Sequence, residues 1–314
     1  MTSSPFRIVY MGTPDFAVPA LEALLAHGEE VVAVVTQPDR PKGRGRKLAP
    51  PPVKEVALAA GIPVLQPKSI KTEEFLAEIG QYRPDLIVVV AFGRILPKPL
   101  IELPRLGTIN VHGSLLPKYR GAAPIQWSLI NNEAETGVTI MQMDEGLDTG
   151  DILLPGAIPI AADDTAATLA AKLSALGGKL LVEALERLKA GTLPPRKQDD
   201  AEATLAPILC KQEGVIDWQK PAAVISGLIR GLDPWPTAST ILDGKQLRLF
   251  APEVIAGQVS ETPGTVCRAD WEGLLIATGR DYLLVRELQL EGAKRLPVDA
   301  FLRGRPMAPG LQLG

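Results

Sequence analysis

The stretch Leu86-Ile87-Val88-Val89-Val90-Ala91 is the most apolar strand candidate in this chain of 314 residues. A second run, Val31–Thr36, is almost continuously β-branched, which is typical of a strand that is buried on both faces of a sheet. Further strands are predicted over Phe6–Met11, Thr108–His112 and Val138–Met143, with helices between the earlier ones. This alternation predicts an α/β domain with a mostly parallel sheet and helices on both faces.

The predicted helices have apolar residues at helical spacing, and they cover Phe16–His27, Lys54–Ala60, Thr72–Gln81 and Thr165–Ala190. The segment 191–207 that follows is rich in Pro, Asp, Thr and Lys and has no apolar period, so we interpret it as a linker. We therefore place one domain at residues 1–190 and a second at residues 208–314.

The second domain has a different pattern, because short alternating strands replace the long helices. A short helix at Ala222–Leu232 leads to Asp233-Pro234-Trp235-Pro236. Strands are then predicted near Ala238–Leu242, Gln246–Val254, Gly264–Arg268, Leu274–Ala277 and Tyr282–Leu290. Five short strands in about 60 residues suggest a small closed β-barrel of the oligonucleotide-binding (OB-like) type.

Composition restricts the function classes. The formal net charge is −3, so any contact with nucleic acid has to come from a local basic patch. The two cysteines, Cys210 and Cys267, lie far apart and away from histidine, which argues against a thiolate zinc site and a disulfide framework. The N-terminus has no signal or transit pattern, and no apolar run is long enough to cross a bilayer. We expect a cytoplasmic protein with no membrane partner and no metal.

Polar motifs are concentrated where the predicted strands end. Ligands of open parallel sheets bind beyond the carboxyl ends of the strands. The loops at those ends are Gly12–Phe16, Gln37–Pro52, Phe92–Pro97, Gly113–Gly121 and Asp144–Asp151.

One of these loops follows a rare histidine. The run Thr108-Ile109-Asn110-Val111-His112-Gly113-Ser114-Leu115-Leu116-Pro117 holds one of only two histidines, and the other, His27, ends a predicted helix. Asn110 and His112 are two residues apart on a strand, so their side chains share one face. An amide donor beside an imidazole suits the stabilisation of a developing oxyanion.

The loop Asp144–Asp151 contains four carboxylates in eight residues. It lacks the ligand spacing of an EF-hand calcium loop. It is either a turn with solvated acids or a glycine-flanked loop that presents a catalytic carboxylate. In the second case Asp148 orients an imidazole or relays a proton. The spacing alone does not choose between these two.

A cation cluster lies in the loop 37–48. Its five cations within eight residues are Arg40, Lys42, Arg44, Arg46 and Lys47. The cluster is either a solvated loop or a contact for a polyanion. Gly43-Arg44-Gly45 does not complete a dinucleotide fingerprint, because Leu48 stands at the third glycine position, and the chain has no Gly-Lys-Ser or Gly-Lys-Thr phosphate loop. The absence of both motifs argues against an enzyme that uses a nicotinamide cofactor or a nucleoside triphosphate.

The motif Asn110–Pro117, with Asp148 thirty-six residues after His112, resembles the folate-dependent formyltransferase family. The resemblance implies a Rossmann-like catalytic domain in which Asn110, His112 and Asp148 form the catalytic set. It implies 10-formyltetrahydrofolate as the donor and no metal. The implied folate-binding residues are Val90, Phe92, Ser114, Leu115, Leu116, Pro117 and Asp144.

Gly12-Thr13-Pro14-Asp15-Phe16-Ala17, the basic loop and Arg120–Gln126 are similar to the branch of this family that acts on tRNA. The implied acceptor is the free α-amine of methionine on initiator tRNA, in a bacterial cytoplasm. Arg40, Lys42, Arg44, Arg46 and Lys47 would bind the acceptor stem, with Arg44 at the centre, and the barrel would contact tRNA phosphates. We expect a monomer.

The resemblance also implies a direct attack of the amine on the formyl carbon, with His112 and Asn110 stabilising the oxyanion and Asp148 helping to move the proton. The nearest competing function is that of a formyltransferase acting on an amino-sugar nucleotide. The hydrolase part of a formyltetrahydrofolate dehydrogenase and a non-catalytic RNA-binding protein are two more candidates. The basic loop argues against the sugar-nucleotide enzyme, and the intact catalytic set argues against the non-catalytic protein.

Overall fold

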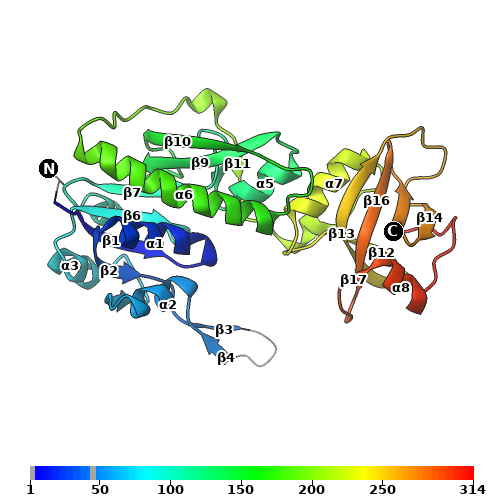
Figure 1. Ribbon diagram of the computed structural model, residues 1–314, viewed down its shortest axis with the longest axis horizontal. Coiled ribbons are helices and arrows are strands. Elements are labelled where there is room, and N and C mark those ends of the chain that lie inside the picture. The colour runs from blue at the N-terminus through cyan, green and yellow to red at the C-terminus, as the bar shows by residue number, and fades with distance from the viewer. Residues whose placement is uncertain (1–3, 43–46) are drawn as a thin grey trace. The chain divides into compact units, whose positions relative to one another are not determined.

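The computed structural model describes residues 4–42 and 47–314, and of Lys42 and Lys47 it describes the backbone only. The chain divides into two compact units, which we describe separately (Figure 1). Unit 1 comprises the described residues up to Pro124, together with 136–158 and 170–206. Unit 2 comprises residues 125–135, 159–169 and 207–314.

Unit 1 is built on a seven-stranded sheet with the order β10-β9-β7-β6-β1-β2-β5. The strands are β1 (Arg7–Gly12), β2 (Glu30–Val35), β5 (Val64–Leu65), β6 (Leu86–Val90), β7 (Thr108–His112), β9 (Glu135–Gln142) and β10 (Ile152–Pro159). The pairs β1–β2, β1–β6, β2–β5 and β6–β7 are parallel, whereas β9 runs antiparallel to β7. The predicted, mostly parallel sheet is confirmed, and β5 and β10 are strands that the sequence pattern did not reveal.

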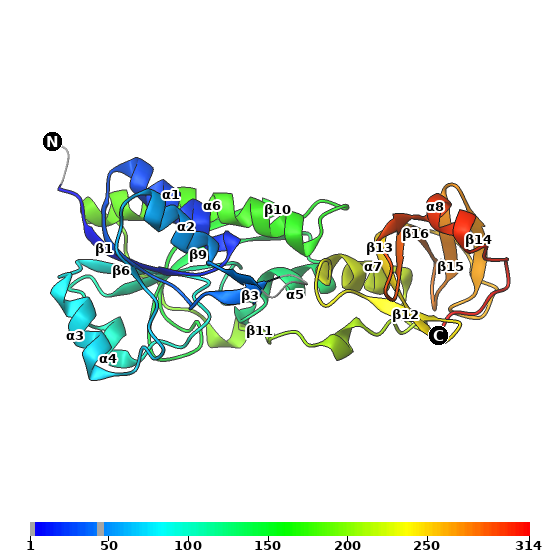
Figure 2. The same ribbon diagram turned by 90° about the horizontal axis from the view of Figure 1, so that it is seen from below.

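Helices cover both faces of this sheet. They are α1 (Val18–His27), α2 (Pro52–Ala59), α3 (Glu73–Gln81), α4 (Lys98–Ile101) and α6 (Ala166–Lys189). Figure 2 shows α1, α2 and α6 on one side of the sheet and α3 and α4 on the other. The helix expected from Phe16 begins at Val18, because Asp15–Ala17 form a 3₁₀ turn, and it ends at Gly28 with φ +83°.

The face of the sheet that α3 and α4 cover carries the side chains that matter for the site. Val89 belongs to the apolar core on that face, together with Phe75 and Leu100. Asn110 pairs with Val89 across the parallel β6–β7 ladder, so its side chain points to the same face. His112, two residues further on, does so too.

Two small strand pairs complete unit 1. β3 (Arg40–Lys42) and β4 (Lys47–Ala49) pair antiparallel at the base of the basic loop. β8 (Arg120–Gly121) pairs in parallel with β11 (Leu205–Ala206). The segment 191–206, which precedes the main part of unit 2 at 207–314, therefore belongs to unit 1.

Unit 2 holds an antiparallel sheet with the order β12-β13-β16-β15-β14, and β17 pairs with β16. Its elements are α5 (Pro124–Ile130), α7 (Ala222–Gly231), β12 (Ser239–Leu242), β13 (Lys245–Ile255), β14 (Val266–Asp270), β15 (Gly273–Ala277), β16 (Tyr282–Leu290), β17 (Leu296–Pro297) and α8 (Val298–Gly304). The five predicted strands are confirmed as β12 to β16. Closure into a barrel stays a prediction, since the hydrogen-bonded order is a path from β12 to β14.

Candidate active site

His112, at the end of β7, is the centre of the site. The residue is 5% exposed, and its Nε2–H donates a hydrogen bond to the carbonyl oxygen of Tyr119 at 2.9 Å. Because a carbonyl only accepts, this bond fixes the proton on Nε2 and leaves Nδ1 for the site. Tyr119 has φ +62°, a left-handed backbone that non-glycine residues rarely adopt.

Asp148 lies beside Nδ1, although 36 residues separate it from His112 in the chain. Its Oδ2 is 3.7 Å from Nδ1 of His112 and accepts a 2.9 Å hydrogen bond from the backbone N–H of Gly121. Its Oδ1 is 3.5 Å from Nδ2 of Asn110, which donates to it. The structure thus brings Asn110, His112 and Asp148 together, as the sequence predicts.

The chemical capacity of this trio follows from its geometry. Nδ2 of Asn110 is a neutral donor on the strand face, and Nδ1 of His112 changes from an acceptor to a donor when the ring is protonated. The nearby Asp148 carboxylate stabilises a charged imidazolium by Coulomb attraction. The site can therefore stabilise an oxyanion and can hold a proton during a reaction.

The loop after β7 carries four of the predicted folate-binding residues. Oγ of Ser114 donates to the carbonyl of Lys118 at 2.6 Å, and Leu116 packs in a small apolar cluster with Met141 and Ile152. Thr139 on β9 holds this loop, since its Oγ1 donates to the carbonyl of Ser114 at 2.7 Å and accepts from the N–H of Leu116 at 3.1 Å. Leu115 and Pro117 are half-buried on the same loop.

The remaining predicted folate-binding residues lie on β6, just beyond it and after β9. Val90 is fully buried in β6, and the side chain of Phe92, 2% exposed, belongs to the core. The carbonyl of Phe92 accepts a 3.1 Å bond from Nε2 of Gln37. Asp144 is exposed, and its Oδ1 accepts from the N–H of Gly146 and from Oγ1 of Thr149, which shapes the acidic loop.

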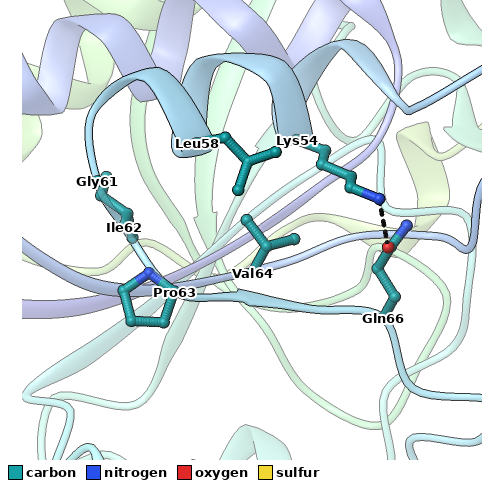
Figure 3. A pocket seen from close by; sticks show the side chains of 7 residues that line it. All are labelled: Lys54, Leu58, Gly61, Ile62, Pro63, Val64 and Gln66. Atoms are coloured by element: carbon teal, nitrogen blue, oxygen red, sulfur yellow. Dashed lines mark hydrogen bonds between the residues drawn. The ribbon is translucent and has the colours of Figure 1, made fainter.

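Two cavities of unit 1 include predicted site residues. One, of about 600 Å³, is lined by residues that include Phe92 and Arg40. The second, of about 390 Å³, is lined by Asp144 and by α4 residues such as Lys98. A third cavity, of about 530 Å³, lies between α2 and β5, where Lys54 and Gln66 share a 2.9 Å hydrogen bond (Figure 3). The residues that line it are outside the predicted site.

The structure describes only part of the basic loop. Arg40 is exposed and donates to Oε1 of Gln37 at 3.4 Å. Lys42 and Lys47 face each other across the β3–β4 ladder, but their side chains lie outside the described part of the chain. Arg44 and Arg46 are also outside the described residues.

Several residues outside the predicted set of site residues contact Asn110, His112 or Asp148. Tyr119 contributes its carbonyl and Gly121 its N–H. Backbone groups of this kind cannot be recognised from the residue type. Gln198 donates through Nε2 to the carbonyls of Asp148 at 2.8 Å and Gly150 at 2.7 Å. It lies in the polar segment 191–207, where no local pattern distinguishes a buried contact from a solvated side chain.

Residues 4–42 and 47–314 present neither grouped metal ligands nor a helix able to span a membrane. This described part of the chain contains no cluster of three or more His, Cys, Asp or Glu side chains that could hold a metal ion. The same residues form no helix that combines the length and apolarity needed to span a membrane.

Comparison with known proteins gives matches over both units. Residues 6–185 match the family model described as formyl transferase, and residues 209–306 match the formyl transferase C-terminal domain. The chain is 60% identical over 298 residues to a methionyl-tRNA formyltransferase of Desulfotalea psychrophila, covering 95% of this chain and 92% of that protein. It is 53% identical over 307 residues to one of Geobacter metallireducens, with 98% of each chain covered.

Solved structures share the fold at low sequence identity. HypX from Aquifex aeolicus in complex with tetrahydrofolic acid aligns with a TM-score of 0.66 at 19% identity, over 99% of this chain and 51% of that one. An N-formyltransferase from Helicobacter canadensis, in complex with folinic acid and dTDP-3-aminofucose, aligns with a TM-score of 0.67 at 20% identity, over 93% and 100%. At these identities the likeness concerns the fold alone.

Proposed function

Because this chain belongs to the formyl transferase family, we propose that it transfers the formyl group of 10-formyltetrahydrofolate to the α-amine of methionine on initiator tRNA. The 60% identity to a methionyl-tRNA formyltransferase over nearly the whole chain supports this acceptor. The observation that carries the chemistry is the convergence of Asn110, His112 and Asp148 at the end of β7.

The first step is attack of the free amine on the formyl carbon, without a covalent enzyme intermediate. The carbonyl oxygen becomes an oxyanion as the new C–N bond forms. Nδ2 of Asn110 donates to it, and Nδ1 of His112 also donates when the ring enters the reaction with a proton on each nitrogen. Donors of this kind stabilise the charge that develops in a transition state. The Tyr119 carbonyl keeps the ring in the required orientation by accepting from Nε2.

The second step breaks the bond between the formyl carbon and N10 of the folate. The attacking nitrogen has to lose a proton and N10 has to gain one, so the products are formylmethionyl-tRNA and tetrahydrofolate. Asp148 accepts and returns this proton, either directly or through water, because its carboxylate is held beside both Asn110 and His112.

We assign the folate pocket to Val90, Phe92, Ser114, Leu115, Leu116, Pro117 and Asp144. Two facts support the assignment. Val90 ends β6, Phe92 follows it and Ser114–Pro117 follow β7, so these six residues lie at the carboxyl edge of parallel strands, where ligands of open sheets bind. Asp144 follows β9, which runs antiparallel to β7, so its loop starts at the opposite edge of the sheet. The cavity of about 390 Å³ that Asp144 lines is formed in part by the loop that also carries Asp148, and it could hold part of a ligand.

We assign the acceptor contacts to Arg40, Lys42, Arg44, Arg46 and Lys47. A cluster of cations on a net acidic chain suits a phosphate backbone. The proposed division is a catalytic domain at 1–190, a linker at 191–207 and a tRNA-binding domain at 208–314. We propose a monomer in the bacterial cytoplasm.

The test is transfer of radiolabelled formyl from 10-formyltetrahydrofolate to methionyl-initiator tRNA, with glycinamide ribonucleotide and an amino-sugar nucleotide as competing acceptors. We expect label on the tRNA alone and its loss in His112→Ala. Label on the sugar nucleotide instead would overturn the proposed acceptor but keep the catalytic set. Transfer by His112→Ala at the wild-type rate would overturn the mechanism.

A further inference from the structure

The segment 196–206, here called the strap, is bonded to both sides of the catalytic site. At its start, Arg196 and Ile152 exchange two backbone hydrogen bonds of 2.8 and 2.9 Å. At its end, β11 pairs with β8, and in this pair Ala206 is the partner of Gly121. Between these anchors the strap runs past the acidic loop that carries Asp148. Side chains of the strap form hydrogen bonds there, so the strap does more than join two parts of the chain.

Gln198 on the strap holds the backbone of the acidic loop. Both hydrogens of its Nε2 are used, one for the carbonyl of Asp148 and one for the carbonyl of Gly150. Asp148 has φ +53°, a left-handed conformation that non-glycine residues rarely adopt and that the surrounding contacts have to hold. The two hydrogen bonds from Gln198 supply such a constraint on either side of Thr149.

Arg120 fixes the orientation of the Gln198 amide. Its Nε and one terminal nitrogen donate to Oε1 of Gln198 at 3.0 and 2.9 Å, and that nitrogen also donates to Asp200 at 2.7 Å. The Arg120 side chain is 8% exposed, so its charge has to be paired. A flipped amide would place NH₂ against the guanidinium and oxygen against two carbonyls, so one orientation is imposed.

The strap also constrains the groups that bond the two catalytic side chains. Thr204 accepts through Oγ1 from the N–H of Tyr119 at 2.9 Å, and Tyr119 supplies the carbonyl that fixes His112. The carbonyl of Thr204 accepts from the N–H of Arg120 at 2.8 Å. The next residue, Gly121, donates to the Asp148 carboxylate.

We propose that Gln198, oriented by Arg120, is a positioning residue that sets the Asp148 carboxylate against His112 and Asn110. This inference rests on the proposed formyl transfer and deepens it. Gln198 touches no reacting atom. Its effect passes through the backbone of Asp148, and it is therefore expected in turnover more than in substrate binding.

The test compares Gln198→Glu and Gln198→Ala with Gln81→Glu, a matched change on the exposed end of α3. Gln198→Glu keeps the size and the pairing with Arg120 but loses both donors to the loop. We expect kcat for transfer to methionyl-tRNA to fall about 10- to 100-fold in both variants, because misplacement by about 1 Å costs about that much. KM for each substrate should change by less than about threefold.

A double-mutant cycle separates positioning from general damage. In an Asp148→Ala background, measured in single turnover, Gln198→Ala should cost less than about twofold, since its target is gone. An equal loss in both backgrounds would overturn the inference, as would wild-type kcat in Gln198→Glu. A wild-type protein that transfers no formyl group would overturn the proposed function, and the positioning role with it.

Discussion

Asp148 shows how much of the site depends on a single charge. Its Oδ2 accepts from Gly121 and faces His112, so Asp148→Asn keeps the shape but removes the proton acceptor and the attraction for an imidazolium. General acid–base groups contribute about 10²–10⁴ in rate, and we expect kcat to fall by that factor. Steady-state kinetics with methionyl-tRNA measure it. Asp163→Asn, an exposed change before α6, should keep wild-type kcat, and equal loss in both variants would contradict the assignment.

Gly121 tests the backbone that supports this carboxylate. It has φ +123°, and a Cβ there would lie 2.7 Å from the carbonyl oxygen of Ala206 on β11. Gly121→Ala should therefore lower the free energy of unfolding by about 1–3 kcal/mol and reduce kcat as well. Urea unfolding gives the first quantity.

The control for Gly121→Ala is the same substitution in α3. Gly80 lies near the end of that helix with open space around its Cβ position. Gly80→Ala should raise the free energy of unfolding by about 0.5–1 kcal/mol, because alanine loses less conformational entropy in a helix. Similar destabilisation by both substitutions would show that the close approach at Gly121 has no special role.

At the residue scale, sequence reasoning reached the side chains that we propose as catalytic but missed the backbone groups that hold them. Asn110 and His112 were predictable because period two on a strand places them on one face. Asp148 depended on the resemblance, since spacing alone left its loop open to a solvated turn. The Tyr119 carbonyl and the Gly121 N–H are backbone groups, and every residue type except proline offers both.

At the scale of elements, an ion pair fixes the base of the β3–β4 hairpin. Nζ of Lys54 on α2 bonds both oxygens of Asp39, at 2.8 and 2.9 Å, and Nε2 of Gln66 donates to Asp39 at 2.8 Å. These hydrogen bonds from Lys54 and Gln66 hold the pKa of the Asp39 carboxyl below its ordinary value. These contacts link the start of the basic loop to α2 and to the residue that follows β5.

A lowered folded-state pKa predicts a definite pH dependence. The carboxylate stabilises the fold above the unfolded pKa of Asp, about 3.9, and the contribution is lost as pH falls through the lower folded value. The excess stability of wild type over Asp39→Asn should therefore be constant from about pH 7 to 5 and decrease progressively as the pH falls below about 4. Urea unfolding of both proteins across this range measures it.

Glu78→Gln on the exposed surface of α3 is the control for Asp39→Asn, and its stability difference should stay small at each pH. A wild-type advantage over Asp39→Asn that grew on acidification would contradict the ion pair as the source.

Elements were predictable where one pattern dominates a whole segment. β6 was predicted to within one residue because it is one apolar run, and β7 was predicted because apolar and polar residues alternate along it. β10 was missed because Pro155 and Gly156 interrupt its pattern, and a strand at the end of the sheet tolerates both. β5 has only two residues, and its pairing with β2 depends on the tertiary fold rather than on local sequence.

At the scale of the whole molecule, the net charge is negative, but one loop holds a cluster of cations. The chain has a formal charge of −3, yet five of its cations fall within residues 40–47. Long-range attraction for a polyanion is therefore weak, and affinity for tRNA has to depend on local contacts with phosphates. Each such contact releases counterions, so binding should weaken steeply as salt rises.

The dependence of kcat/KM on salt concentration therefore measures how many phosphates the basic loop contacts. Each cation that contacts a phosphate contributes about 0.7–0.9 to the slope of log(kcat/KM) against log[salt]. Replacing Arg40, Lys42, Arg44, Arg46 and Lys47 by Gln should flatten that slope by this amount for every contact removed, and should leave kcat at saturating tRNA nearly unchanged. Lys68→Gln with Lys71→Gln, both exposed, controls for lost charge elsewhere. An unchanged slope in the loop variant would move the tRNA contact to another surface, because a solvated loop leaves counterion release unaffected.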